Sequence, residues 1–197
     1  EVRGRDSAGI SMIYILKEKD FDAFLKRLAE ENLTGMLEGR MTYDFLGNKS
    51  IAIKRSVDGP GNGLVSISFV YKHAAEIGRL GDNVRFLREQ IIDDLIFLLL
   101  TESPYACCTL SCHTRWASVG AITEANCHPV DNQTLRENDG NKGIIHVCLN
   151  GDIDNYVDLK RELEKKGERI HSEITTDTKI IPLQIIKYIK QGADVEK

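Results

Sequence analysis

An arginine and the chain's single tryptophan, Arg115 and Trp116, stand side by side where an apolar, strand-like run gives way to a turn. The guanidinium of Arg115 is planar and permanently charged, so it can hold a carboxylate through two parallel hydrogen bonds. Trp116 adds a large rigid ring. Because loops at strand ends often carry binding sites, the pair indicates a site for a small anionic ligand. An ordinary ion pair beside a packed ring is the alternative.

Five different short motifs along the chain contain residues that could bind a ligand or take part in catalysis. In order they are Arg3-Gly4-Arg5-Asp6-Ser7-Ala8-Gly9, His113-Thr114-Arg115-Trp116-Ala117, Asn126-Cys127-His128-Pro129, Leu149-Asn150-Gly151 and Thr176-Asp177-Thr178. This order resembles that of the glutaminase domains of class II glutamine amidotransferases, and most closely that of the glutamine:fructose-6-phosphate aminotransferase family. The resemblance covers residues 1–9 and about 109–197, and residues 11–106 carry much less of it.

The resemblance implies that glutamine loses its side-chain ammonia by acyl transfer, through a nucleophile, an oxyanion and an acyl-enzyme. Members of the family use an N-terminal cysteine, whose α-amino group, with a pKa of about 8, acts as the general base. Residue 1 is Glu1, and none of the five cysteines can supply a free α-amine. The chain begins without methionine and ends in an expected helical region. We therefore expect a fragment of a longer protein that does not hydrolyse glutamine by itself.

Matching positions supply the other expected catalytic groups. The resemblance assigns an oxyanion hole to the side-chain amide of Asn150 and the backbone N–H of Gly151, two donors that favour the charged intermediate. A plain turn is the alternative, because Asn-Gly is a common turn dipeptide. The resemblance also makes Arg3 a brace for the backbone of the absent nucleophile.

The resemblance also implies how glutamine is bound. It assigns the α-carboxylate to Arg115, with Ser118 as a second donor, and the α-ammonium to Asp177. It makes Trp116 a gate over the site and His128 a residue that lines the pocket. Structural alternatives exist for three of these residues, since Asp177 can be a helix N-cap, Trp116 a half-buried core residue and His128 a structural histidine.

Two positions depart from the family's pattern and bear on the acceptor of the ammonia. Val119 stands where a histidine is common, and Asp152 stands where an apolar residue usually follows the glycine. The favoured acceptor of the ammonia is fructose 6-phosphate, which a sugar isomerase domain on the same longer chain would bind. We also expect the full-length protein to be a homo-oligomer. Phosphoribosyl pyrophosphate as acceptor, or a glutamine-binding pseudoenzyme without a nucleophile, are the open alternatives.

Composition is that of an ordinary globular protein. The 197 residues suffice for one sizeable domain, and a net charge of -4 gives no reason to expect nucleic acid or a membrane as a partner. No apolar run is long enough to span a membrane, and no signal peptide is recognisable. The five cysteines are an odd number in apolar segments, which indicates free thiols and a cytoplasmic location.

A zinc-stabilised binding module is a rival from another class, because several residues are of metal-ligand type: Cys108, Cys112, His113, Cys127 and His128. Structural zinc uses paired ligands about two to four residues apart on a tight knuckle. Residues 108–113 instead lie in an extended apolar run, where thiols pack as small hydrophobic groups. We therefore expect neither a metal ion nor a cofactor.

Hydrophobic patterning predicts an α+β domain. Strands are expected at 10–16, 50–56, 64–71, 105–112 and 143–149, with a short edge strand at 169–173. Helices are expected between Asp20 and Gly35, at 83–101 after an Asp82 cap, at 154–166 before Gly167, and at 177–191.

The resemblance implies a four-layer αββα sandwich of the N-terminal nucleophile type, incomplete at both ends. On this interpretation residues 1–197 are one partial glutamine amidotransferase type 2 domain. Residues from about 17 to 103, with their added helix and hairpin, are an elaboration to which the sequence assigns no role.

Overall fold

The computed structural model describes residues 6–42, 48–56, 63–74, 79, 81–115, 120–134 and 143–193. Its main element is a four-stranded sheet in the order β2 (Ser50–Arg55), β3 (Leu64–Ala74), β1 (Ser7–Lys17), β4 (Cys107–Arg115). All neighbouring strands in this sheet are antiparallel. A second sheet consists of β5 (Val130–Asp131) and β6 (His146–Val147).

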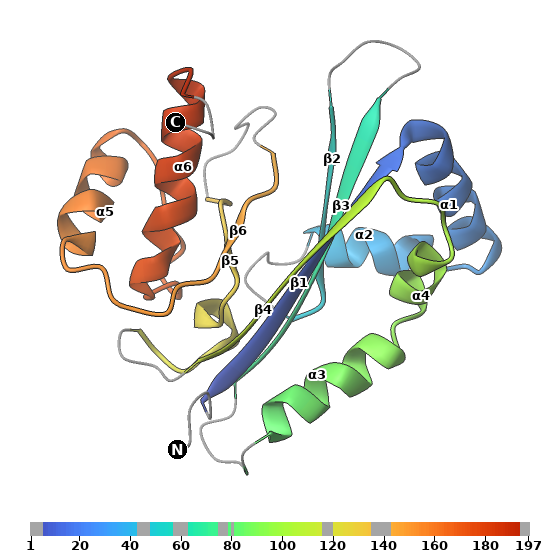
Figure 1. The fold of residues 1–197 in the computed structure, drawn as a ribbon, viewed down its shortest axis with the longest axis horizontal. Helices are drawn as coiled ribbons and strands as arrows, with labels where there is room; N and C mark the ends of the chain where they lie inside the picture. Colours follow the sequence, from blue (N-terminus) through green and yellow to red (C-terminus); the bar gives the residue numbers. More distant parts are fainter. Residues whose placement is uncertain are drawn as a thin grey trace.

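Helices lie on both sides of the larger sheet. One side carries α1 (Glu18–Glu30), α2 (Thr34–Thr42), α3 (Asp82–Ile92) and α4 (Leu95–Thr101). The other side carries the smaller sheet, the 3₁₀ turns η1 (Glu124–Asn126) and η2 (Asp177–Lys179), α5 (Tyr156–Lys165) and α6 (Ile180–Lys190), as Figure 1 shows. None of the described helices has the length and apolar character needed to cross a membrane.

The main core fills the space between the larger sheet and α1–α4. Alternate residues of β1 and β3 face it, so that Met12 lies opposite Phe69 across the strand pair. The helical spacing of Phe21, Phe24 and Leu28 puts these three side chains on one face of α1, where each is at most 1% exposed. Burying each one stabilises the fold by about 1.5–3 kcal/mol.

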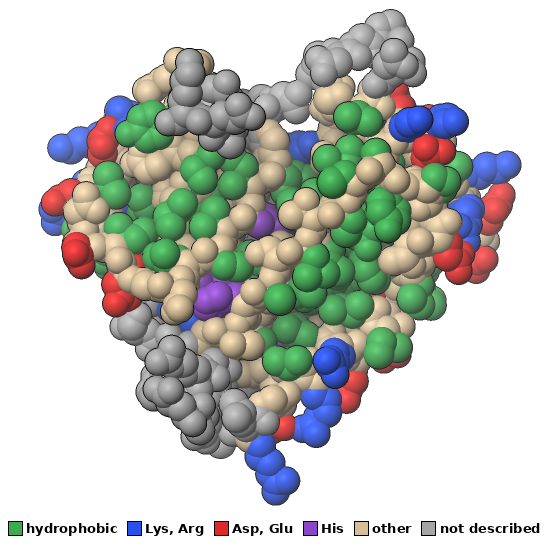
Figure 2. Space-filling model, in the orientation of Figure 1, with side chains coloured by type: hydrophobic (Ala, Val, Ile, Leu, Met, Phe, Trp, Pro, Cys, Tyr) green, Lys and Arg blue, Asp and Glu red, His purple; other side chains and the backbone are tan. Residues whose placement is uncertain are grey.

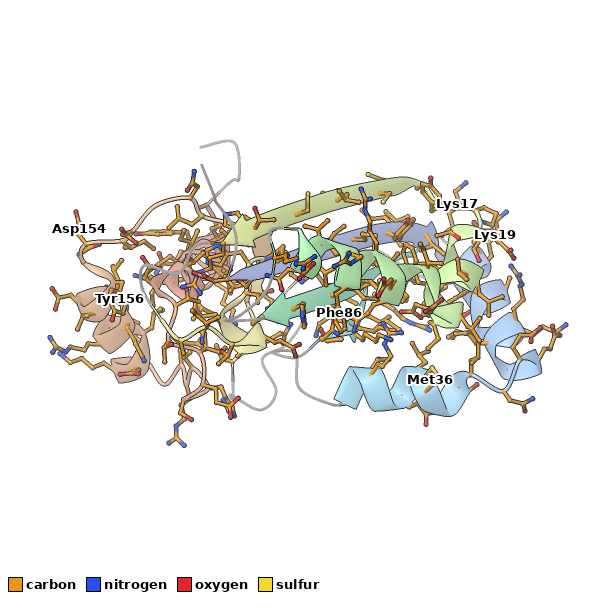
Figure 3. All side chains as sticks on the ribbon, turned by 90° about the horizontal axis from the view of Figure 1, so that it is seen from below. Lys17, Lys19, Met36, Phe86, Asp154 and Tyr156 are labelled. Atoms are coloured by element: carbon orange, nitrogen blue, oxygen red, sulfur yellow. The ribbon has the colours of Figure 1, made fainter. Side chains whose placement is uncertain are left out.

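Two views show how the surface and the ends are arranged. Figure 2 shows hydrophobic side chains gathered over β4, α3 and α4, where Leu98 and Leu110 are among the exposed residues. Figure 3 shows Lys17 and Lys19 at the end of the molecule away from Asp154. The helices that build the main core and the α5–α6 region therefore occupy opposite ends.

The carboxylate of Asp94 is a buried charge with many partners. It accepts hydrogen bonds of 2.9 and 2.7 Å from Nη1 of Arg40 and one of 2.5 Å from the hydroxyl of Tyr71. It also accepts the backbone N–H groups of Ile96 and Phe97 and so caps α4. Burial, together with this carboxylate, raises the pKa of Tyr71. Asp94 therefore joins α2, β3 and α4 through one side chain.

Most of the expected elements in the first half of the chain are confirmed. The four strands of the larger sheet lie within a few residues of their predicted ranges. The first helix begins at Glu18, so Asp20 lies in its first turn and is not its cap. Gly35 does not follow the end of a helix but lies within α2, which the sequence did not predict.

The prediction of a single helix at 83–101 is wrong. The chain instead forms two helices, α3 and α4. They are separated at Asp94, whose side chain caps the start of α4. The residue that precedes α3 is Gly81, and Asp82 is its first residue. Leu95 and Leu98 of α4 are exposed in this arrangement.

Two strands expected in the second half are not found as predicted. The strand at 143–149 is reduced to His146–Val147, because β5 pairs with only these two residues. Residues 169–173 form no strand, since the backbone N–H of Ile174 bonds to the carbonyl of His171 in a local turn. The helices at 154–166 and 177–191 are confirmed as α5 and as η2 with α6.

The layers follow the expected order only in outline. The smaller sheet contains two strands of two residues each in the described chain. The structure therefore establishes a mixed α/β architecture with an antiparallel sheet, and it does not establish a sandwich of two full sheets.

Replacing Asp94 with asparagine is expected to lower the free energy of unfolding by about 3–5 kcal/mol, because it leaves the largely buried side chain of Arg40, 13% exposed, without its counter-charge. Denaturant unfolding measures the loss. The control is Glu102→Gln, which removes an exposed partner of Arg27 and should cost less than about 1 kcal/mol. Equal, small losses in the two variants would contradict the role given to Asp94.

Candidate functional site

Arg115 is the last residue of β4 and reaches the end of the larger sheet. Antiparallel pairing sets it opposite Ser7, the first residue of β1, and its carbonyl accepts the N–H of Asp6 at 3.3 Å. Its side chain is buried, and burial lowers the pKa of the guanidinium. The thiol group of Cys127 and the carboxylates of Asp177 and Asp6 act on this pKa in the opposite direction. The carboxylate of Asp177 is therefore one of several groups whose charge acts on the guanidinium of Arg115.

The backbone of β1 and the segment that carries His128 approach each other closely at Gly9. A Cβ atom at position 9 would lie 2.1 Å from the carbonyl oxygen of His128 and 3.4 Å from Cδ of Pro129. No side chain fits in that space. Glycine at this position is therefore what allows the residues after Arg115 to pack against the larger sheet.

The ring of His128 links three of the sequence motifs. Its Nδ1 accepts the backbone N–H of Leu149 at 3.4 Å, so Nε2 carries the proton and donates to Oγ1 of Thr176, also at 3.4 Å. The ring centre lies 4.8 Å from that of His113. Burial, with the positive charges of His113 and Arg115, lowers the pKa of His128 to about 3. His128 is thus a neutral, buried side chain that links the backbone at Leu149 to the side chain of Thr176.

Asp177 is buried and holds the loop that follows Gly151. Its Oδ2 accepts the backbone N–H of Ile153 at 2.7 Å. Its Oδ1 lies 3.3 Å from the hydroxyl of Thr178 and 3.5 Å from that of Thr176. The predicted alternative role as a helix N-cap is wrong, because Asp177 is the first residue of η2 and its side chain makes no cap bond.

The other predicted site residues fall into two groups. Asn150 and Gly151 are exposed in the loop after β6, directly after Leu149, whose N–H binds His128. Figure 2 shows histidine side chains at the surface in this region, near β4 and β6. The remaining predicted residues lie outside the described part of the chain: Arg3, Trp116 and Ser118.

Sequence analysis missed the side chain of Asn126, which is fully buried. Its Oδ1 accepts the backbone N–H groups of Thr175 and Thr176 at 2.7 and 2.8 Å. Its Nδ2 donates to Oγ1 of Thr123 and to the carbonyl of Glu173. The only signal in the sequence is its place in the motif Asn126-Cys127-His128-Pro129.

A buried ion pair beside the site was also missed. Nζ of Lys179 donates to Oδ1 of Asp131 at 2.6 Å and to the carbonyl of Asp131 at 2.8 Å. Burial acts to raise the pKa of Asp131, but Lys179 and Lys72 outweigh it and the pKa is lowered. Burial lowers the pKa of Lys72, which comes from β3. Lys72 of β3 thus lies close enough to this pair to act on the pKa of Asp131.

The cysteine and histidine side chains do not gather into a metal site in the part of the chain that the structure describes. There is no group there of three or more His, Cys, Asp or Glu side chains able to hold an ion. Cys108 and Cys112 lie on β4, while the thiol of Cys127 donates to the carbonyls of His73 and Thr123.

Several curated proteins that are similar to this chain carry the same enzyme name. The chain is 42% identical over 84 residues to glutamine–fructose-6-phosphate aminotransferase (isomerizing) of Methanothermobacter thermautotrophicus, which is 43% of this chain and 12% of that protein. The same enzyme of Sulfurisphaera tokodaii is 42% identical over 82 residues, 42% of this chain and 12% of that protein. That of Gluconobacter oxydans is 38% identical over 96 residues, 49% of this chain and 14% of that protein.

The chain is related in sequence to the glutamine–fructose-6-phosphate aminotransferases. It spans about one eighth of the length of these curated aminotransferases. No family model matches it. A dimeric ferredoxin-like protein from an uncultured marine organism superposes with a TM-score of 0.25 and 12% identity, over 57% of this chain and 98% of that one. At that score the superposition carries no argument about the fold.

Gly9→Ala is expected to lower the free energy of unfolding by about 1–3 kcal/mol or more, because the new methyl group meets the backbone oxygen of His128. Thermal and denaturant unfolding provide the measurement. Gly39→Ala is the control, since its Cβ would have nothing within 4 Å and alanine favours the helix by about 0.5–1 kcal/mol. A Gly9→Ala protein as stable as wild type would show that this contact is absent.

The free energy of unfolding is expected to fall as the pH drops from about 6.5 to about 4. Burial lowers the pKa of His128 to about 3 and of His146 to about 4, so in this range only the unfolded chain takes up their protons. Each histidine contributes a slope of at most about 1.4 kcal/mol per pH unit. Urea unfolding between pH 4.5 and 8 measures it. His146→Gln should reduce the slope below pH 6.5 and leave the slope above pH 7 unchanged; an unaltered slope below pH 6.5 would be inconsistent with this assignment.

Proposed function

We propose that the chain is the glutaminase half of a glutamine–fructose-6-phosphate aminotransferase. It would bind L-glutamine and release ammonia for fructose 6-phosphate, which a sugar isomerase domain of a longer protein would bind. The observation that supports the proposal is that Arg115 and Asp177 are both buried and that the charge of Asp177 acts on Arg115, while His128 bonds to Leu149 and to Thr176, the neighbour of Asp177. A cytoplasmic, homo-oligomeric full-length enzyme of amino-sugar biosynthesis belongs to the same proposal.

The two charges suit the two ends of a free amino acid. The guanidinium of Arg115 has the fork geometry that holds an α-carboxylate, and Asp177 has the negative charge that an α-ammonium requires. Both side chains are withdrawn from water, with exposed fractions of 6% and 3%, and charge-assisted hydrogen bonds are stronger in such surroundings. A glutaminyl side chain within a peptide lacks both charges, so the site selects free glutamine.

The other roles complete the proposal. Asn150 and the N–H of Gly151 would form the oxyanion hole, His128 would line the pocket, and Trp116 and Ser118 would cover the substrate and bind its carboxylate. His128 is neutral and fully engaged in hydrogen bonds, which suits a rigid wall better than proton transfer. Arg3 would brace the nucleophile.

A glutamine-binding protein without hydrolase activity is the second candidate. Transfer to another acceptor, such as phosphoribosyl pyrophosphate, is the remaining alternative. In either case the glutamine-binding roles of Arg115 and Asp177 stay the same.

Titration calorimetry with L-glutamine tests the binding step. The chain is expected to bind glutamine with a 1:1 stoichiometry, and Arg115→Ala should weaken binding by at least roughly tenfold, because a charge-assisted pair is worth about 1.5–3 kcal/mol. Arg161→Ala, which removes an exposed arginine of α5, is the matched control and should leave binding unchanged. Undiminished binding by the Arg115 variant would exclude the assignment.

An ammonia-release assay tests the catalytic step. The 197-residue chain is expected to release no ammonia from glutamine, because it lacks the nucleophile. Turnover by this polypeptide that disappears in Arg115→Ala would overturn that expectation and require a nucleophile among the described residues.

A further inference from the structure

The segment that carries Asp177 is anchored by one amide side chain. Asn126 lies in η1, and every hydrogen-bonding position of its amide is used within the protein. Its oxygen receives two consecutive backbone N–H groups, those of Thr175 and Thr176, and its nitrogen donates to the carbonyl of Glu173. The amide therefore fixes the three backbone groups that lead directly into Asp177.

Other contacts hold the same segment from the side of Arg115. Gly120 has φ +92° and approaches so closely that a Cβ there would lie 2.9 Å from the backbone nitrogen of Thr176. The N–H of Ala121 donates to Oγ1 of Thr175 at 3.0 Å. Residues that follow Arg115 in the chain thus touch residues that precede Asp177, so the separation of the two charges depends on this segment.

We propose that Asn126 is a positioning residue that sets the subsite for the α-ammonium of glutamine by fixing the backbone that carries Asp177. The inference rests on the proposed function, because it assumes that Asp177 binds the ammonium. Asn126 itself need not touch the substrate.

The amide is chemically suited to this task. One planar group accepts from two neighbouring N–H groups and donates to a carbonyl and a hydroxyl, which fixes the direction of the peptide chain as well as its distance. An aspartate at position 126 would keep the acceptor half and lose both donor bonds. An alanine would lose all of them and leave the buried N–H groups of Thr175 and Thr176 without their acceptor.

A comparison of two ligands separates this role from a general contribution to folding. L-Glutamine needs subsites for carboxylate, ammonium and amide, whereas glutaramate (5-amino-5-oxopentanoate) has the carboxylate and the amide but no amino group. A residue that acts through Asp177 changes the ratio of the two affinities. A residue that merely supports the pocket weakens both affinities by the same factor.

The experiment is titration calorimetry of the wild-type chain and its variants with both ligands. Wild type should prefer glutamine over glutaramate by roughly tenfold or more, the value of one charge-assisted contact. Asn126→Ala and Asp177→Asn should each reduce that preference to near one, and Asn126→Asp should give an intermediate value. Combining Asn126→Ala with Asp177→Asn should cause no further loss of preference. Arg115→Ala should weaken the binding of both ligands.

The outcomes distinguish the two hypotheses. If wild type binds neither ligand, the proposed function fails and this inference fails with it. If wild type prefers glutamine and Asn126→Ala keeps the same ratio, only the positioning role is overturned. Should Asn126→Ala not fold, Thr123→Ala serves instead, because it removes a partner that orients the amide. That variant should lower the ligand ratio and speed amide hydrogen exchange at Thr175 and Thr176, and an unchanged ratio overturns the proposal.

Discussion

The close approach of Gly9 to the carbonyl of His128 is the constraint on which the rest of the site depends. Backbones can come this near only where no side chain intervenes, and the contact joins the larger sheet to the region of β5, β6 and η2. Arg115 enters from the sheet, while Asp177 enters from the other region. Without this contact the two charges would belong to separate parts of the molecule.

Uncharged side chains hold the backbone segments around these charges in place. The amide of Asn126 and the uncharged ring of His128 make the hydrogen bonds that hold the segments at 149 and 175–176. Burial of charged groups is costly unless they are paired, and the Lys179–Asp131 pair next to the site meets that condition. On the proposed function, Arg115 and Asp177 are the two charges that the carboxylate and ammonium of a zwitterionic ligand would meet.

Sequence patterns were sufficient for much of the fold and for part of the site. The alternation in β1 and β3 and the helical spacing in α1 predict these elements because their apolar faces are large and regular. The pattern fails at Asp94, whose role as a cap depends on Arg40 and Tyr71, distant residues that periodicity does not reveal. It also fails at Asn126 and Lys72, because hydrogen bonds and charges between distant segments leave no local signal. Motif order located Arg115, His128 and Asp177, but not the contacts that hold them.

A crystal structure of the chain with L-glutamine tests the central claim most directly, since it locates both charged ends of the ligand. The account predicts that the α-carboxylate lies on the guanidinium of Arg115 and the α-ammonium on the carboxylate of Asp177, with Asn126 still bound to the N–H groups of Thr175 and Thr176. Glutamine bound elsewhere, or bound with neither charge contacting these two residues, would contradict it.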